Sequence, residues 1–252
     1  MTQRYRQRLW LSRILTMLLP LVISLANAQA AVDNAIYAEL LSRYVNQGHV
    51  DYKGLKTQEG RLDDYLGVLA QVDPDALSHD ARFAFYINAY NAWTLKLILT
   101  GYPGVASIKD LGSFFSSPWK KKIVKIHGET LTLDQIEHEI LRPEFKDPRV
   151  HFAINCAALS CPPLRSEPYE ADRLDAQLDA ATIAFINRTD RTYMQGDTLY
   201  VSRIFKWFNE DFKPDVEGFV RRYARDGLKA KLDAVDKIKV RYLDYDWSLN
   251  GS

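Results

Sequence analysis

The stretch Ala81-Arg-Phe-Ala-Phe-Tyr-Ile-Asn-Ala-Tyr-Asn-Ala-Trp-Thr-Leu-Lys-Leu-Ile-Leu99 is the strongest fold signal in the chain, because 14 of its 19 residues are apolar. Gly101 and Pro103 follow the stretch and predict where it ends. A helix that is apolar on nearly every side is buried on nearly every side. We therefore expect a buried helix over residues 81–99.

The polar side chains of this helix fall on two opposite edges. At about 100° per residue, Arg82 and Lys96 lie close together and predict a narrow solvent-exposed edge. Asn88, Asn91 and Thr94 form a second stripe on the other side. Buried amides are destabilising unless they are hydrogen-bonded, so this stripe either faces a polar site or braces neighbouring backbone.

The remaining patterns predict more helices than strands. Residues 150–155 and 238–243 are predicted as strands, and Thr132 is expected to cap a short helix that runs through Leu141 and stops before Pro143. This order predicts a mainly helical α+β domain over residues 31–252, with a small, largely antiparallel sheet built from short strands and hairpins. The other predicted helices cover 35–46, 62–72, 170–187, 204–212 and 216–225, and the predicted hairpins are 122–126 with 130–133 and 192–195 with 198–202.

The charge of the chain is unevenly distributed. Its 252 residues carry a formal net charge of +1, but the first 30 contain four arginines and no acidic residue. Without those four, 29 basic residues face 32 acidic ones and the net charge is −3. A mildly acidic body argues against nucleic acid as a partner.

The amino terminus has the order of a secretory signal peptide. Basic residues end at Arg13, an apolar run covers residues 14–26, and small residues follow at Ala26, Ala28 and Ala30. We expect residues 1–30 to be removed after Ala28 or Ala30. The apolar run is short for a spanning helix and contains Pro20, which makes an uncleaved anchor the less favoured alternative. A periplasmic or secreted protein without a stable membrane span is therefore expected.

The two cysteines of the chain are Cys156 and Cys161. In an oxidising compartment the pair can form a disulfide. Alternatively, Cys156 is a thiolate nucleophile, with His138 or His151 as the base and Asn91, Asn155 or Glu137 as the orienting group. A strand over 150–155 would put His151 on the face opposite Cys156, so His138 from a separate helix remains a possible partner. Zinc is the third interpretation, but the His and Cys spacing is not typical of a structural site, and we predict no metal and no cofactor.

Four segments of the chain contain closely spaced polar residues: Phe85-Tyr-Ile-Asn-Ala-Tyr-Asn-Ala92, Leu133-Asp-Gln-Ile-Glu-His-Glu-Ile-Leu-Arg142, Val150-His-Phe-Ala-Ile-Asn-Cys-Ala-Ala-Leu-Ser-Cys-Pro-Pro-Leu164 and Val201-Ser-Arg-Ile-Phe-Lys-Trp207. Together these segments resemble the domain-of-unknown-function 547 family. The polar residues that match the motifs of this family are Asn88, Asn91, His138, His151, Asn155, Cys156, Ser160 and Cys161. The resemblance implies no particular reaction. The family includes intracellular plant proteins as well as secreted bacterial ones, which makes an obligatory disulfide less attractive.

Two functions follow as hypotheses. The first is an exported cysteine-dependent hydrolase or acyltransferase that acts on an amide or thioester of a small-molecule or peptide ligand. The second is a non-catalytic binding or scaffold module in which the Asn, His and Cys side chains only brace the core. Both place the polar residues of three distant segments in one region, which the structure can test.

Overall fold

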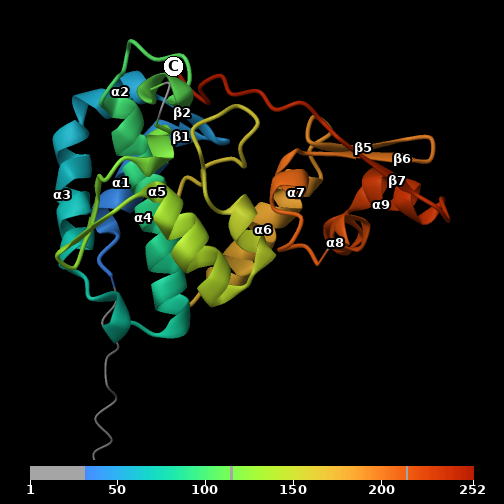
Figure 1. The fold of residues 1–252 in the computed structure, drawn as a ribbon, viewed down its shortest axis with the longest axis horizontal. Coiled ribbons are helices and arrows are strands. Elements are labelled where there is room, and N and C mark those ends of the chain that lie inside the picture. Colours follow the sequence, from blue (N-terminus) through green and yellow to red (C-terminus); the bar gives the residue numbers. More distant parts are fainter. Residues whose placement is uncertain (1–31, 114–115, 214) are drawn as a thin grey trace, which may run out of the picture.

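The structure, a computed structural model, describes residues 32–113, 116–213 and 215–252 (Figure 1). The predicted signal peptide, residues 1–30, lies outside the described residues. The expected fold class, mainly helical α+β, is confirmed. The α-helices are α1 (Ala35–Tyr44), α2 (Tyr52–Thr57), α3 (Glu59–Gln71), α4 (His79–Leu99), α5 (Leu133–Gln135), α6 (Leu174–Ile186), α7 (Ile204–Trp207), α8 (Val216–Tyr223) and α9 (Asp226–Asp233).

Helix α4 is the buried helix that the apolar stretch predicts. The Ser78 side chain caps its first turn by accepting a hydrogen bond from the Ala81 amide. It packs between α3 and the helical segment that follows α5 (Figure 1). Its exposed edge is also as expected, because Arg82 pairs with Asp75 and Glu144 while Lys96 pairs with Glu59 and Asp63.

The segment after α5 departs from the prediction. Thr132 and Gln135 do form the expected capping box. The helix then continues as a π-helix, η4 (Ile136–Phe145), so the predicted stop before Pro143 is wrong. The wider π-helical turn gives the proline ring space that an α-helix lacks, and the helix ends at Lys146 in a left-handed conformation.

The predicted strand over 150–155 is also wrong. Asp147 accepts a hydrogen bond from the Arg149 amide, and Pro148 opens a 3-10 helix, η5 (Pro148–Phe152), followed by irregular chain. The Asp147 cap and Pro148 therefore favour a 3-10 helix where the apolar residues alone predict a strand. The argument that His151 and Cys156 lie on opposite faces of a strand no longer applies.

Strands form three small sheets within the described residues. Two are antiparallel hairpins, and the third adds a parallel strand to an antiparallel pair. The predicted helix over 204–212 is only the single turn α7, and α2 and α9 were not predicted. The strands are β1 (Val45–Asn46) with β2 (His49–Val50), β3 (Val124–Ile126) with β4 (Glu129–Leu131), and β5 (Thr192–Gln195) with β6 (Thr198–Val201) and β7 (Lys239–Tyr242).

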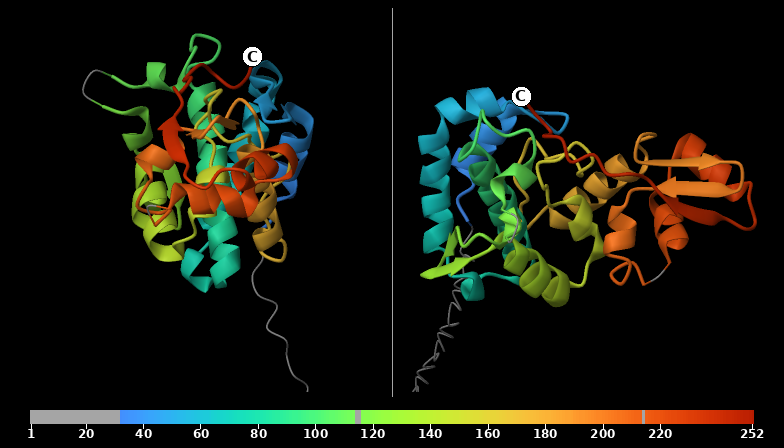
Figure 2. Two further views of the ribbon diagram at one scale, coloured as in Figure 1. Left: turned by 90° about the vertical axis from the view of Figure 1, so that its right-hand side faces the viewer. Right: turned by 45° about the horizontal axis from the view of Figure 1, so that its top comes forward.

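Two groups of buried apolar side chains adjoin each other. One surrounds α4, and the other lies among α6, α7, α8 and the β5–β6–β7 sheet, which projects to one side in Figure 2. After β7 the chain turns back across the first group (Figure 1). This carboxyl-terminal strap, residues 245–252, bonds to three distant segments: Leu249 N donates to Ala106 O, Asn250 N to Ala157 O and Ser252 N to Val50 O. The described helices include none that is long and apolar enough to cross a bilayer.

Candidate functional site

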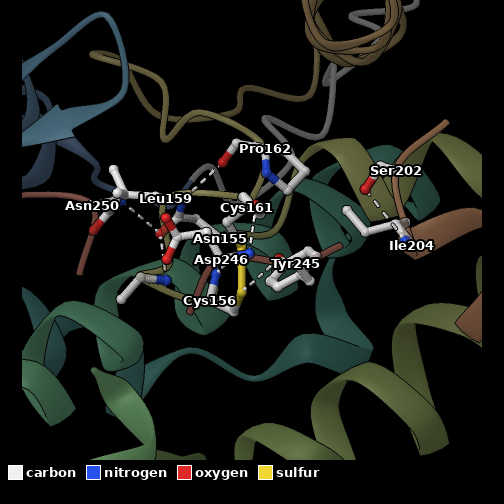
Figure 3. The surroundings of a disulfide bond; sticks show 12 residues. Asn155, Cys156, Leu159, Cys161, Pro162, Ser202, Ile204, Tyr245, Asp246 and Asn250 are labelled. Carbon is white, nitrogen blue, oxygen red and sulfur yellow. Dashed lines mark hydrogen bonds between the residues drawn. A yellow bond between two sulfur atoms is a disulfide. The ribbon is translucent and has the colours of Figure 1, made fainter. Parts of the chain in front are cut away.

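The loop with both cysteines, which we call the double-cysteine loop (residues 155–164), is hydrogen-bonded to the carboxyl-terminal strap, and Figure 3 shows Tyr245, Asp246 and Asn250 of the strap beside it. Cys156 and Cys161 form a disulfide with their Cα atoms 6.1 Å apart. The sequence left three interpretations of the cysteine pair open: a disulfide, a nucleophile and a zinc site. The structure contains the disulfide, which the intracellular members of the family had made the less expected state. Neither sulfur is a thiolate in this state, so the cysteine-nucleophile hypothesis applies only to the reduced protein.

Both sulfur atoms accept hydrogen bonds. The Cys156 amide donates to Cys161 Sγ over 2.7 Å. The Tyr245 hydroxyl, on the carboxyl-terminal strap, lies 3.3 Å from Cys156 Sγ and is the donor, because a disulfide sulfur carries no hydrogen (Figure 3). No imidazole is hydrogen-bonded to either sulfur in the described residues.

The predicted asparagines brace backbone. Asn88 donates to the Tyr169 carbonyl and accepts from the Tyr169 amide, at 2.8 and 2.9 Å. Asn91 donates to the Ala153 carbonyl at 3.0 Å and accepts from the Asn155 amide at 2.7 Å. Both ends of each buried amide are thus engaged, and the bracing interpretation of the stripe on α4 accounts for them.

Asn155 and Ser160 hold the double-cysteine loop in the same way. Asn155 donates to the Pro162 carbonyl and accepts from the Ala157 amide, at 2.7 and 2.9 Å. Ser160 Oγ accepts from the Asp246 amide at 2.9 Å. Neither side chain lines the pocket described next. The proposed orienting role of Asn91 and Asn155 therefore has no support in this arrangement.

A pocket of about 220 Å³ lies where the two apolar groups meet. It brings together five of the predicted site residues: Glu137, His138, His151, Cys156 and Cys161. The other walls are mainly aromatic and come from α4, η3 (Pro118–Lys120), α7 and the carboxyl-terminal strap. The aromatic lining residues are Tyr90, Trp119, Trp207, Phe208, Tyr245 and Trp247.

Glu137 is the buried carboxyl group of this pocket. Its side chain comes from the first turn of η4, is 8% exposed and accepts a hydrogen bond of 3.1 Å from the Tyr90 hydroxyl. Burial raises the pKa of Glu137 to about 7, although Tyr90 and the charge of Arg142 act in the opposite direction. Both the neutral and the ionised form are therefore accessible at neutral pH.

The two histidines differ in their partners. Arg142 Nη1, which can only donate, lies 3.0 Å from His138 Nδ1, so the proton of neutral His138 is on Nε2. His151 Nε2 lies 2.6 Å from Asp211 Oδ2, and its ring stacks on Phe208 with centroids 4.0 Å apart. Burial lowers the pKa of both histidines, which keeps them neutral at pH 7.

Asp211 joins His151 to Arg142. It accepts hydrogen bonds from Arg142 Nε and Nη2 at 2.6 and 3.1 Å in addition to the bond from His151. Burial opposes its ionisation, but these partners hold the pKa of Asp211 well below its usual value. The result is a fixed carboxylate that orients one imidazole and one guanidinium behind the pocket.

The described residues contain no group of three or more His, Cys, Asp or Glu side chains placed to hold a metal ion. His138 is hydrogen-bonded to Arg142 and His151 to Asp211, and the two sulfur atoms are bonded to each other. The zinc interpretation of these four residues therefore has no supporting geometry.

A family model described as "Protein of unknown function, DUF547" matches residues 74–186. This segment belongs to the DUF547 family. No curated protein and no solved structure matches the chain. The DUF547 segment contains α4, η4 and the double-cysteine loop, and so includes the five predicted residues that line the pocket.

Other residues of the site lie outside the DUF547 segment and were missed by sequence analysis. Asp211, Tyr245 and Trp247 come from the carboxyl-terminal part of the chain, and no local motif marks them. Trp207 belongs to an aromatic run whose helical spacing favours core packing. Phe205 and Phe212 of that run are indeed buried, but Trp207 is 44% exposed and lines the pocket. The tryptophans near the carboxyl terminus were the one signal in the sequence that could have pointed to these walls.

Proposed function

We propose that this protein is an exported hydrolase or transferase whose pocket performs acid–base chemistry on a small-molecule or short-peptide ligand. Glu137 is the proton-transferring group. The single observation that carries the proposal is a buried carboxyl group, with a pKa of about 7, in the wall of an aromatic pocket. A general acid or base works best when its pKa is near the working pH.

The neighbours of Glu137 support this role. His138 keeps an Nε2–H that can donate a hydrogen bond to a ligand, because Arg142 occupies its Nδ1. His151 Nε2–H is directed to Asp211, which fixes the ring and leaves Nδ1 unprotonated. Separate donor and acceptor groups around one carboxyl group are what proton transfer to and from a bound ligand requires.

The aromatic walls support a ligand with a flat or apolar face. Trp207, Tyr245 and Trp247 pack together, with ring centroids 4.6 to 5.6 Å apart, and Trp119 contacts Trp247 at 5.7 Å. Lys109 Nζ lies 3.8 Å from the centroid of the Trp247 ring and places a positive charge over that ring. Peptide side chains, sugar rings and aromatic small molecules all present such faces.

The test of the enzymatic proposal uses the oxidised protein and panels of chromogenic esters, glycosides and peptide amides. A substrate should show a rate that depends on a group with a pKa near 7, and Glu137→Gln should lower that rate about 100-fold or more. Glu139→Gln, an exposed neighbour on the same helix, is the matched control. Full activity of the Glu137 variant would contradict the assignment.

A second candidate is the cysteine-dependent hydrolase or acyltransferase, in the reduced protein. It is favoured by the position of Cys156 in the same pocket as His138 and His151. Activity that appears only after reduction, and is lost in Cys156→Ser, would support it over the Glu137 proposal. Ligand-dependent quenching of the pocket tryptophans without turnover would support the non-catalytic binding module.

Export is proposed from the amino-terminal sequence, in which basic, apolar and small residues follow one another. Amino-terminal sequencing of protein recovered from the periplasm or medium should begin at Gln29 or Ala31. Recovery of the full-length chain in the cytoplasm would contradict export.

A further inference from the structure

The disulfide is part of the pocket wall rather than of the apolar core. Both Cys156 and Cys161 line the pocket, and Cys161 also lines a second cavity. Cys156 is partly exposed, whereas Cys161 is 6% exposed. We therefore expect a small molecule in the pocket to reach Cys156 more easily than Cys161.

We propose that low-molecular-weight thiols enter this pocket and exchange with the Cys156–Cys161 disulfide in the folded protein, with attack on Cys156. This thiol–disulfide exchange is an activity separate from the acid–base chemistry proposed above, because it does not use Glu137.

Hydrogen-bond donors are in place for both thiolates that the exchange produces. The Cys156 amide, 2.7 Å from Cys161 Sγ, stabilises Cys161 as the first leaving group. The Tyr245 hydroxyl, 3.3 Å from Cys156 Sγ, stabilises the Cys156 thiolate that forms in the second step. Burial raises the pKa of Tyr245, so its hydroxyl stays protonated and remains a donor. Stabilised thiolates make better leaving groups and a more easily reduced disulfide.

The exchange balances in two steps. A thiol loses its proton to solvent, and the thiolate attacks Cys156 Sγ, so the Cys156–Cys161 bond breaks, a mixed disulfide forms on Cys156 and Cys161 leaves as a thiolate. A second thiolate attacks the sulfur of the bound small molecule and releases Cys156 as a thiolate together with a small disulfide. Two electrons pass from the two thiols to the protein, and both protein thiolates take protons from solvent.

The loop does not depend on the disulfide for its shape. Asn155 ties its two ends together, Ser160 Oγ binds the Asp246 amide, and the Leu159 amide donates to the Ser248 carbonyl over 2.8 Å. A loop closed over so few residues also restricts the unfolded chain little. Reduction is therefore expected to leave the protein folded.

The test uses the folded, full mature protein and reduced glutathione as the probe, with rapid alkylation and intact-mass measurement. The disulfide should be reduced without denaturant, while tryptophan fluorescence and circular dichroism stay native. A disulfide that resists glutathione until denaturant is added would overturn the proposal, and this arm needs no substitution.

Variants then identify the attacked sulfur and the donor. With oxidised glutathione, Cys161→Ser should form a mixed disulfide at Cys156 at least about ten times faster than Cys156→Ser forms one at Cys161, because Cys156 is partly exposed whereas Cys161 is buried. Tyr245→Phe should shift the exchange equilibrium toward the protein disulfide by about tenfold, whereas Tyr193→Phe in β5 should not. Equal rates for the two cysteine variants, or no effect of Tyr245→Phe, would contradict the proposed geometry.

One further variant separates this proposal from the proposed function. Glu137→Gln should keep its exchange rate within about twofold of wild type while it loses any acid–base activity. A Glu137 variant that loses exchange while it remains folded would overturn the separation of the two activities.

Discussion

Glu137 couples proton binding to folding. Its folded pKa of about 7 lies above the ordinary value of 4.5, so the folded state binds this proton more tightly than the unfolded state. The stability that this provides is fully present below about pH 4.5 and is lost as the pH rises to about 7. We expect a loss of about 2–4 kcal/mol in the free energy of unfolding from this group.

Glu137→Gln should lack this pH-dependent part of the free energy of unfolding, because the glutamine amide is neutral at every pH. Urea denaturation of wild type and variant at pH 5 and pH 8 measures the difference, and Glu139→Gln should behave as wild type. Parallel pH dependence in wild type and Glu137→Gln would show that Glu137 is not a buried neutral acid.

Asp211 is the second residue that links charge to stability. Asp211→Asn removes the ionic partner of Arg142 and the charged hydrogen-bond acceptor of neutral His151, and should lower the free energy of unfolding by about 2 kcal/mol, since the group is partly exposed. Because its folded pKa is lowered, the contribution is present above about pH 3.8 and lost as the pH falls below that value.

Denaturation at pH 7, with Glu210→Gln as the exposed neighbouring control, measures the loss at Asp211. The same variant should lower the pKa of His151 further, because Asp211 is what favours its charged form. A His151 resonance that titrates at an unchanged pH in the Asn variant would argue against this contact.

Helix α4 supports the pocket through its asparagines. Asn91→Ala leaves the Ala153 carbonyl and the Asn155 amide without partners and should lower the free energy of unfolding by about 2–4 kcal/mol. Thr94 is a matched control on the same buried stripe, since its hydroxyl has no hydrogen-bond partner among the described residues. Thr94→Val should therefore be neutral or slightly stabilising, and equal losses at both positions would contradict the bracing role.

The β1–β2 turn contacts the double-cysteine loop at one glycine. Gly48 has φ +84°, and a Cβ at this position would clash with Pro163. Gly128 occupies the same place in the β3–β4 turn, with φ +79°, but apart from its two chain neighbours no described residue has an atom within 4 Å of where its Cβ would be. We expect Gly128→Ala to lower the free energy of unfolding by about 1 kcal/mol. Gly48→Ala should lower it by at least about 3 kcal/mol, because only this substitution adds a steric clash.

Thermal or urea denaturation of the two alanine variants gives the comparison. If both variants lose the same free energy, backbone strain alone explains the turn and Gly48 has no part in holding the double-cysteine loop.

Across the whole molecule, the carboxyl-terminal strap joins regions that are far apart in sequence. The Tyr52 hydroxyl donates to Asn250 Oδ1 over 2.7 Å, and Asn250 Nδ2 lies 3.3 Å from Asn155 Oδ1. A double-mutant cycle of Tyr52→Phe with Asn250→Ala should give a coupling energy of about 1 kcal/mol. Tyr193 belongs to β5, which lies far from α2 in Figure 1, so the free-energy changes of Tyr52→Phe and Tyr193→Phe should be additive.

The meeting of the two apolar groups explains why the pocket exists. Its walls come from α4, η3, η4, the double-cysteine loop, α7 and the carboxyl-terminal strap. Removal of residues 245–252 would take away Tyr245 and Trp247 and the strap's bonds to three segments. The strap thus couples the stability of the fold to the shape of the pocket.

Local patterns in the sequence determined much of the secondary structure. The apolar run of α4, the capping box at Thr132 and the β3–β4 and β5–β6 hairpins were predictable, because each depends on residues only a few positions apart. The segment over 150–155 was not, because the Asp147 cap competes with its apolar character. Glu137, His138, His151, Cys156 and Cys161 were chosen as site residues from the sequence, and all line one pocket.

Only the tertiary structure decided what those residues contact. It separated Asn88, Asn91, Asn155 and Ser160, which hold backbone, from the residues that face the pocket. It also paired the two sulfurs and brought Asp211, Tyr245 and Trp247 to the site from 50 or more residues further along the chain. The physical reason is that burial, proton affinity and hydrogen-bond partners depend on the path of distant segments, which short-range periodicity does not encode.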